Sequence, residues 1–377
     1  MVDLDVPSFY ALITSCRMFY DAYKSDKGVT LYKVTINALG STFPLAIALQ
    51  AAIRSDWTGI SLLNSRTCKD DLLQKIHKFG HEYLDPNNKQ TIRPEDLSLR
   101  FAWEITSFHS IVERFAREFT EEQIAAASRK LDASMEWSRD GPARPATSTE
   151  LSRVQSALYY MEISRVLLPD SGNNDHYRLP RDMLWHYSPP WDIATTYGVC
   201  RFLDRRVYRY LEKASDVLRN AALGGGIEFD VWYLKIGLRG IDRLTDEEFG
   251  PGIIDAIEST RVRFGPSRCF LPAPGWGCTW LRPVEKGSKT RSLDIDHILA
   301  RFPREDDGPC INWYHNIMIY SDMGRRPRPW KIAWWDLART HEIFGDTSGI
   351  EEIKEMARGK VCGPSDKIDY CKVAGYY

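Results

Sequence analysis

Apolar residues recur at steps of three and four along most of the chain, which is the spacing of helices that bury one face. The first such stretch follows Asp5, a residue type that caps helices, and has Pro7 in its first turn, where a missing N–H removes no hydrogen bond. Its apolar face consists of Val6, Phe9, Ile13, Cys16, Tyr20 and Tyr23. We therefore predict one core-facing helix that reaches Lys24.

Two further apolar runs complete the first 55 residues. The run from Val29 to Leu39 is rich in β-branched residues and is compatible with a strand, but Gly40 stands where a left-handed helix cap would, which favours a helix. The run from Phe43 to Ile53 is apolar on every side, which is typical of a fully buried helix. We predict three packed helices that begin an all-α core.

Helical patterns continue through the rest of the chain. Thr120 with Gln123, and Thr147 with Glu150, have the spacing of a capping box, so each pair predicts the start of a new helix. The other predicted helices are 68–83, 94–119, 197–222, 229–244, 293–302, 311–320, 334–344 and 350–357.

Two stretches interrupt the helical periodicity. Residues 139–148 contain Gly141, Pro142 and Pro145, and we interpret them as a linker between helical regions at 1–138 and 149–377. Residues 264–291 are rich in Pro, Gly and Trp and keep no period, which predicts an irregular segment packed on the surface. The predicted fold is mainly α, an irregular array of many helices with a long Pro/Gly/Trp-rich loop region in the C-terminal third.

Composition narrows the classes of partner. Lys and Arg number 50 and Asp and Glu 51, so no global basic charge attracts nucleic acid, and nucleic-acid binding is not expected. The eight cysteines are scattered without a disulfide or zinc spacing, and we interpret them as reduced thiols. No window holds 18 consecutive apolar residues, so we expect no membrane span and a cytoplasmic or nuclear protein.

The segment Gly275-Trp276-Gly277-Cys278 is the sharpest local motif. It resembles the segment around the nucleophile of autophagy-type papain-fold cysteine proteases, and the resemblance implies a hydrolase with Cys278 as nucleophile and a later histidine, His315, as its base. The downstream Asp-Pro-His element of that family is absent, and Pro283 would interrupt a helix that starts at Cys278. The competing interpretation is a buried thiol in a loop anchored by tryptophans, and we assign no catalytic residue.

Aromatic residues gather with polar ones in two clusters, residues 185–192 and 312–316, a composition that lines ligand pockets and interfaces. The ligand-binding alternative requires these two clusters to meet in space. The candidate contact residues are Trp185, His186, Trp191, Trp276, Trp280, Trp313 and His315. The alternative is that these aromatic residues simply pack the ends of helices. His77 and His81 share a helix face but lack a third zinc ligand, so we expect neither metal nor cofactor.

The opening pattern from Ser8 to Tyr20, with Leu39-Gly40 and the run from Leu45 to Ala52, resembles a large group of uncharacterised filamentous-fungal helical proteins. Some of these carry the latter half of an F-box-like sequence at this place. The Leu-Pro and spaced leucines that begin an F-box and engage a ubiquitin-ligase linker are missing here. The leading hypothesis is a non-enzymatic, intracellular helical protein that binds a protein partner. The alternatives are a cysteine hydrolase and a small-ligand-binding protein.

Overall fold

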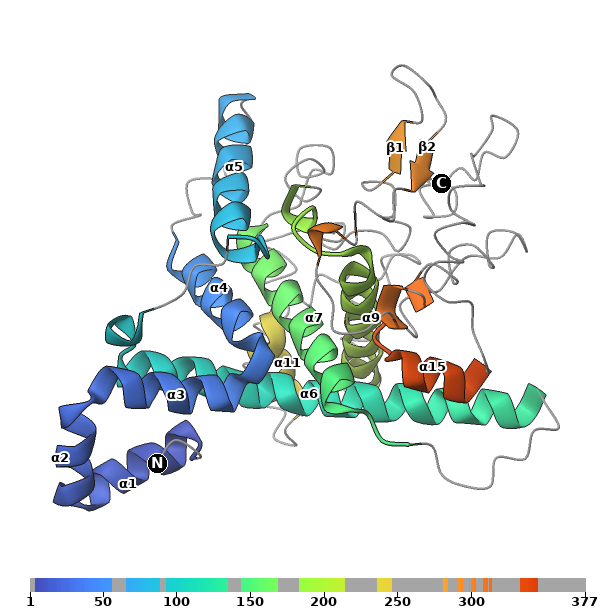
Figure 1. The fold of residues 1–377 in the computed structure, drawn as a ribbon. Helices are drawn as coiled ribbons and strands as arrows, with labels where there is room; N and C mark the ends of the chain where they lie inside the picture. Colours follow the sequence, from blue (N-terminus) through green and yellow to red (C-terminus); the bar gives the residue numbers. More distant parts are fainter. Residues whose placement is uncertain are drawn as a thin grey trace.

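The computed structural model describes most of the N-terminal half of the chain and parts of the rest. The described residues are 4–55, 66–88, 93–134, 144–168, 183–213, 236–245, 281–283, 291–293, 298, 300–302, 308–310, 312–313 and 333–344. This part is mainly α and forms an irregular array of helices, as predicted (Figure 1). Its strands form one short antiparallel pair, in which Arg282 lies opposite Ser292.

The helices differ widely in length and direction. They are α1 (Val6–Ser15), α2 (Arg17–Ser25), α3 (Lys27–Leu39), α4 (Phe43–Arg54), α5 (Arg66–Phe79), α6 (Leu99–Ser134), α7 (Ser148–Leu167), α9 (Pro190–Lys213), α11 (Gly237–Thr245) and α15 (Leu337–Phe344). Short turns η1 (Gly40–Thr42), η3 (Gly80–Leu84) and η4 (Pro94–Asp96) adjoin them, and the strands are β1 (Leu281–Pro283) and β2 (Arg291–Leu293).

The first predicted helix is two helices. Asp5 caps α1 by accepting a hydrogen bond from the backbone N–H of Ser8 at 2.6 Å, as predicted. The chain then becomes extended at Cys16, with φ −143° and ψ 125°, and α2 begins at the next residue. This break brings Phe9 and Tyr23 into edge-to-face contact at 5.4 Å, so folding α2 back onto α1 buries both rings. The prediction of one continuous helix was therefore wrong.

The helix prediction for the second run is confirmed, because α3 ends at Gly40, which has φ 54°. α3 and α4 leave this glycine in different directions (Figure 1). α4 is buried over most of its surface, but Ile53 is 52% exposed, so the expectation of burial on every side was wrong at its C-terminal end.

By length and composition alone, residues Lys27–Arg54 pass as a candidate membrane span, the one such stretch in the described part. Half of its apolar 18-residue window is buried within the protein. The bend at Gly40 divides the stretch into helices of 13 and 12 residues. Each is roughly 20 Å long, shorter than the roughly 30 Å hydrocarbon core of a bilayer. Buried core helices pass the same test, so the expectation of no span stays a prediction.

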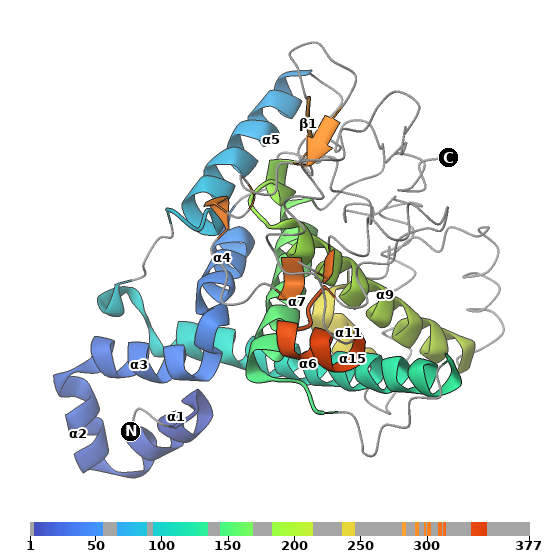
Figure 2. The ribbon, with the colours of Figure 1, turned by 45° about the vertical axis from the view of Figure 1, so that its right-hand side comes forward.

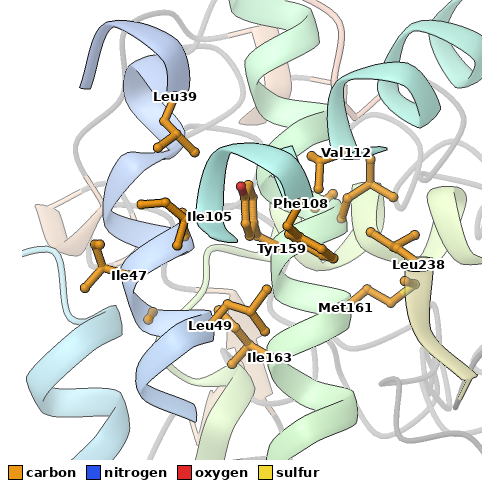
Figure 3. Packing of buried hydrophobic residues seen from close by; sticks show 14 of the residues in the cluster. Leu39, Ile47, Leu49, Ile105, Phe108, Val112, Tyr159, Met161, Ile163 and Leu238 are labelled. Carbon is orange, nitrogen blue, oxygen red and sulfur yellow. The ribbon is translucent and has the colours of Figure 1, made fainter. Parts of the chain in front are cut away.

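α6 is the longest element and runs for 36 residues, roughly 54 Å. The predicted start of a new helix at Thr120 was wrong, because the Thr120 hydroxyl donates to the carbonyl of Arg117 within the continuous helix, at 2.9 Å. α7 packs against α6 on one side and α9 on the other, and α4 also contacts α7. Figure 3 shows the resulting core, where Phe108 of α6, Tyr159 of α7 and Leu49 of α4 lie close together.

The capping box at the start of α7 is confirmed. The backbone N–H of Thr147 donates to the Glu150 carboxylate, and the backbone N–H of Glu150 donates to the Thr147 hydroxyl. Of the predicted linker, residues 139–143 lie outside the described residues, whereas Ala146 packs against the core. Because α4, α6 and α7 contribute to one hydrophobic cluster, residues from both predicted regions share that core. The division at 139–148 stays a prediction.

The C-terminal third is described only in short pieces. Of the predicted irregular segment 264–291, the structure describes β1 and the first residue of β2. Leu293 belongs to β2, so the helix predicted from 293 begins too early, although residues 298, 300 and 301 are helical. The predicted helix 334–344 begins later, at Leu337, after the capping residue Asp336. Helix 350–357 lies outside the described residues.

Candidate functional site

The predicted contact residues that the structure describes are mostly buried. Trp185, Trp191 and Trp313 are 1%, 5% and 2% exposed, whereas His186 is exposed. Trp276, Cys278, Trp280 and His315 lie outside the described residues, so the hydrolase hypothesis has no described geometry.

The turn that carries Trp185 and His186 is fixed on its outer side by α5 and its following turn. Tyr187 donates its hydroxyl to the carbonyl oxygen of His77 at 3.2 Å. The Tyr187 ring covers Gly80 so closely that a Cβ at residue 80 would overlap the ring. Arg301 donates to Nε2 of His186 at 2.6 Å and lies over the Tyr187 ring at 5.8 Å. Both imidazoles of this region are therefore held in ordinary packing contacts.

The aromatic cluster at Asn312 and Trp313 is hydrogen-bonded to α15 and to the residues just before it. The Asn312 side-chain amide donates to the Thr340 hydroxyl at 2.8 Å and to the backbone carbonyl of Trp335 at 3.3 Å. The hydrogen bonds of this cluster thus lead to α15, whereas those of the Trp185 turn lead to α5. A pocket formed jointly by the two clusters has no support from these contacts.

A group of polar and aromatic residues lies where α7, α9 and the Trp185 turn meet. We call it the Asp192 cluster and define it as Arg153, Tyr160, Trp185, Ser188 and Asp192. α7 supplies Arg153 and Tyr160, which are seven residues apart and therefore lie two turns apart on one helix face. That helix packs along α9 in both views (Figures 1 and 2).

Asp192 is the third residue of α9 and is half-buried. Burial raises the pKa of its carboxyl to about 7, and the nearby charge of Arg153 opposes that rise only in part. No hydrogen bond or ion pair of this carboxylate occurs among the residues that the structure describes; its backbone carbonyl accepts the Thr196 hydroxyl at 2.8 Å. Asp192 is therefore a half-buried acid with a raised pKa, and its carboxylate has no hydrogen-bond partner among the described residues.

Tyr160 and Trp185 differ in their polar contacts. Burial raises the pKa of Tyr160, the charge of Asp192 raises it further, and a hydrogen bond from Ser188 opposes the rise. The rings of Tyr160 and Trp185 are 6.1 Å apart. The indole N–H of Trp185 is buried and finds no hydrogen-bond acceptor within the described part. Within the described part, the buried polar atom of this cluster that lacks a partner is thus the Trp185 indole nitrogen.

The two buried charges of Arg339 and Glu150 are paired with each other. Arg339 of α15 forms a bidentate ion pair with Glu150, at 2.7 Å and 2.8 Å, and both side chains are at most 1% exposed. The remaining guanidinium N–H groups of Arg339 reach the carbonyls of Arg144 and Pro145. Because protein groups satisfy the charges of both Arg339 and Glu150, this ion pair fixes α15 onto α7.

Metal-binding groups are not evident in the described ranges. No three residues among His, Cys, Asp and Glu come together there in an arrangement that could hold a metal ion. His109, the buried histidine of α6, stacks on Tyr159 and has its Nδ1 3.2 Å from the tyrosine hydroxyl. Burial lowers the pKa of His109, so it is neutral and acts as a core residue.

α1 and α2 lie at one end of the described part of the molecule (Figure 1). Large apolar side chains of α1, α2 and α6 are exposed to solvent. Tyr10 of α1 and Trp103 of α6 are 44% and 41% exposed and meet edge to face at 5.7 Å. We call this pair the aromatic surface. Met18 and Tyr20 of α2, at 67% and 48%, are also exposed.

The sequence did not predict the raised pKa of Asp192 or the exposed pair of Tyr10 and Trp103. Asp192 stands beside the predicted Trp191, but its desolvation depends on α7, a distant part of the sequence. Tyr10 and Trp103 both lie in predicted helices, and only the α1–α6 packing brings them together.

Comparisons of the chain with protein-family models, with curated proteins and with solved structures found no match. The resemblance of the first 55 residues to the fungal helical group therefore stays an expectation.

Proposed function

We propose that this chain is an intracellular helical protein-interaction protein without catalytic activity, and that it holds a partner protein at the aromatic surface. The exposed pair of Tyr10 and Trp103 carries this proposal. Tyrosine and tryptophan are the residue types that most often dominate binding energy at protein interfaces. Two such rings exposed side by side on helices leave apolar area that a partner would remove from water.

The structure around the pair supports binding in two ways. The rings hold each other in a fixed edge-to-face arrangement at 5.7 Å, so less side-chain freedom is lost when a partner binds. Charged residues lie next to the pair, since Arg100 and Glu104 form an exposed ion pair on α6 at 2.9 Å. An aromatic centre with a polar rim is the usual composition of a reversible protein interface.

The reducing environment expected of an intracellular protein agrees with the cysteines. Cys16, Cys200 and Cys310 are free thiols in the part of the chain that the structure describes.

The proposal is tested with the double variant Tyr10→Ser/Trp103→Ser, because serine removes the aromatic area while the exposed positions tolerate a polar residue. The matched control is Ile53→Ser, which removes a different exposed apolar side chain. Wild type and the control should recover the same partner by cross-linking and affinity purification from native extracts of the source cells. The double variant should lose at least about tenfold in affinity for that partner.

A second measurement places the contact. The purified partner should protect Tyr10 and Trp103 of the wild-type protein from hydroxyl-radical labelling and leave Ile53 unchanged. A wild-type protein that stays monomeric without a partner in native extracts would overturn the proposal. Equal affinity of the double variant and the wild type would also overturn it, provided circular dichroism shows that both are folded.

A further inference from the structure

α11 packs against α6 next to the aromatic surface. Arg239, near the start of α11, donates to the backbone carbonyl of Glu104 at 3.4 Å, and Glu104 directly follows Trp103 in the chain. Further along α11, Asp242 forms an ion pair with Arg114 of α6. α11 therefore begins beside the aromatic surface and extends along α6 away from it.

Two arginines of α11 have no acidic partner. Arg239 and Arg243 are four residues apart, so they lie one turn apart on the same face of the helix. Both are exposed, and neither forms an ion pair in the part of the chain that the structure describes. Their guanidinium groups are therefore open to a partner that carries negative charge.

The surroundings of these arginines do not repel an acidic partner. The face of α6 that carries Trp103 continues with two uncharged residues, the half-buried Ser107 and the exposed Ser110, at the i+4 and i+7 positions. Glu104 and Asp242 lie close to α11's arginines, and the carboxylate of each is already paired with an arginine of α6. This side of the molecule thus has an excess of positive charge beside two exposed aromatic rings.

This combination determines the class of partner. An apolar side chain of the partner removes the exposed rings from water, and carboxylates form charge-assisted hydrogen bonds with free guanidinium groups. We propose that the partner presents an acidic amphipathic helix, which places an apolar residue on the aromatic surface and two carboxylates, four residues apart, on Arg239 and Arg243. This inference rests on the proposed function and specifies the chemistry of the partner.

The probe is a fluorescein-labelled synthetic peptide of about 16 residues, long enough to form a helix. Leucines occupy one face of this peptide, and glutamates with i, i+4 spacing flank them; in the control peptide, lysine replaces every glutamate. Fluorescence anisotropy with the full chain should show that the acidic peptide binds at least about tenfold more tightly than the basic one. Added salt should weaken the binding of the acidic peptide. Equal affinity for the two peptides would overturn the proposal.

The variant Arg239→Glu/Arg243→Glu should weaken binding of the acidic peptide by at least about tenfold, because like charges then face each other. Its matched control is Lys75→Glu/Lys78→Glu, which changes the net charge equally at exposed positions of α5. α5 lies away from α6 in both views (Figures 1 and 2), so this control should bind as the wild type does. Unchanged binding by the folded arginine variant would overturn the proposal.

The natural partner separates this inference from the proposed function. If the aromatic double variant loses that partner and the arginine variant keeps it, the aromatic surface binds a partner that is not acidic, and this inference alone fails. If both variants keep the partner, both proposals fail. Phosphatidylcholine vesicles that contain phosphatidylserine represent an anionic membrane. Vesicle binding that requires both arginines, without binding of the acidic peptide, would overturn the acidic helix as the partner.

Discussion

Asp192 illustrates how the setting of one residue changes its chemistry. An ordinary aspartate is ionised at neutral pH, but burial against α7 raises the pKa of this carboxyl to about 7, so near neutrality both forms are populated. The charge of Arg153 opposes this rise in part. Tyr160, the other titratable group that interacts with it, keeps its proton because its own pKa is raised. The ionised form of Asp192 therefore opposes folding.

The sign of this effect gives the first prediction for stability. The pKa of Asp192 rises from 3.8 in the unfolded chain to about 7 in the fold, so the folded state binds more protons between these values and loses stability as pH rises through them. Asp192→Asn removes this loss. Its gain in the free energy of unfolding should be larger at pH 8 than at pH 4, by about 2 kcal/mol after allowance for partial exposure. Urea unfolding at the two pH values measures it, and equal gains would contradict it.

At the scale of elements, the ends of helices were predictable where a side chain caps locally. Asp5, Gly40 and the Thr147–Glu150 box mark helix ends that the structure confirms, because each acts within a few residues of its own position. The Thr120 pattern failed because the same hydroxyl can bond back to the carbonyl of Arg117 inside a continuous helix. The break at Cys16 carries no glycine or proline signal, and the Phe9–Tyr23 contact that accompanies it is tertiary.

The Asp192 cluster was less predictable than the helix ends, because it depends on tertiary contacts. Composition pointed to the aromatic stretch around Trp185 and Trp191, but burial of both rings shows that they serve packing as well. The residue that distinguishes the stretch is Asp192, and its partners on α7 lie more than 30 residues earlier in the chain. Periodicity and spacing describe single elements, so they cannot show which polar group two elements leave without a partner.

Gly40 gives a prediction at this scale. Its φ of 54° is unfavourable for residues that carry a Cβ, while no atom lies within 4 Å of a Cβ placed there. Gly40→Ala should therefore lower the free energy of unfolding by about 1 kcal/mol through backbone strain alone. Thermal unfolding followed by circular dichroism checks it. Gly80→Ala is the contrasting variant, because its Cβ would overlap the Tyr187 ring, and it should be the more destabilising of the two.

At the scale of the whole molecule, one ion pair joins distant parts of the chain. Glu150 and Arg339 are 189 residues apart in sequence, and their bidentate contact holds α15 against the start of α7. The Arg339 side chain also binds the carbonyls of residues 144 and 145, so the segment before α7 is fixed by the same contact. α15 lies beside α6 in both views (Figures 1 and 2), and Phe119 of α6 meets Trp334 at 5.7 Å.

Loss of one partner of this pair should be severe. Arg339→Met leaves the Glu150 carboxylate buried without its counter-ion, so the free energy of unfolding should fall by about 3–5 kcal/mol in urea denaturation. Arg17→Met removes one side of the exposed Arg17–Asp21 pair and should change stability by less than about 0.5 kcal/mol. The double variant Glu150→Gln/Arg339→Met should lose less than the sum of its single variants. A loss in Arg339→Met no larger than that in Arg17→Met would contradict this account.

The distance between Glu150 and Arg339 also has a consequence during synthesis of the protein. A ribosome that adds about 5–20 residues per second needs roughly 10 to 40 s to travel from one to the other. During that interval Glu150 has been synthesised but Arg339, which pairs with it, has not. The capping bonds with Thr147 are then the local contacts that the Glu150 side chain can form. The start of α7 therefore reaches its final burial only after most of the polypeptide has left the ribosome, and the emerging N-terminal half passes through a stage in which this surface is open to chaperones.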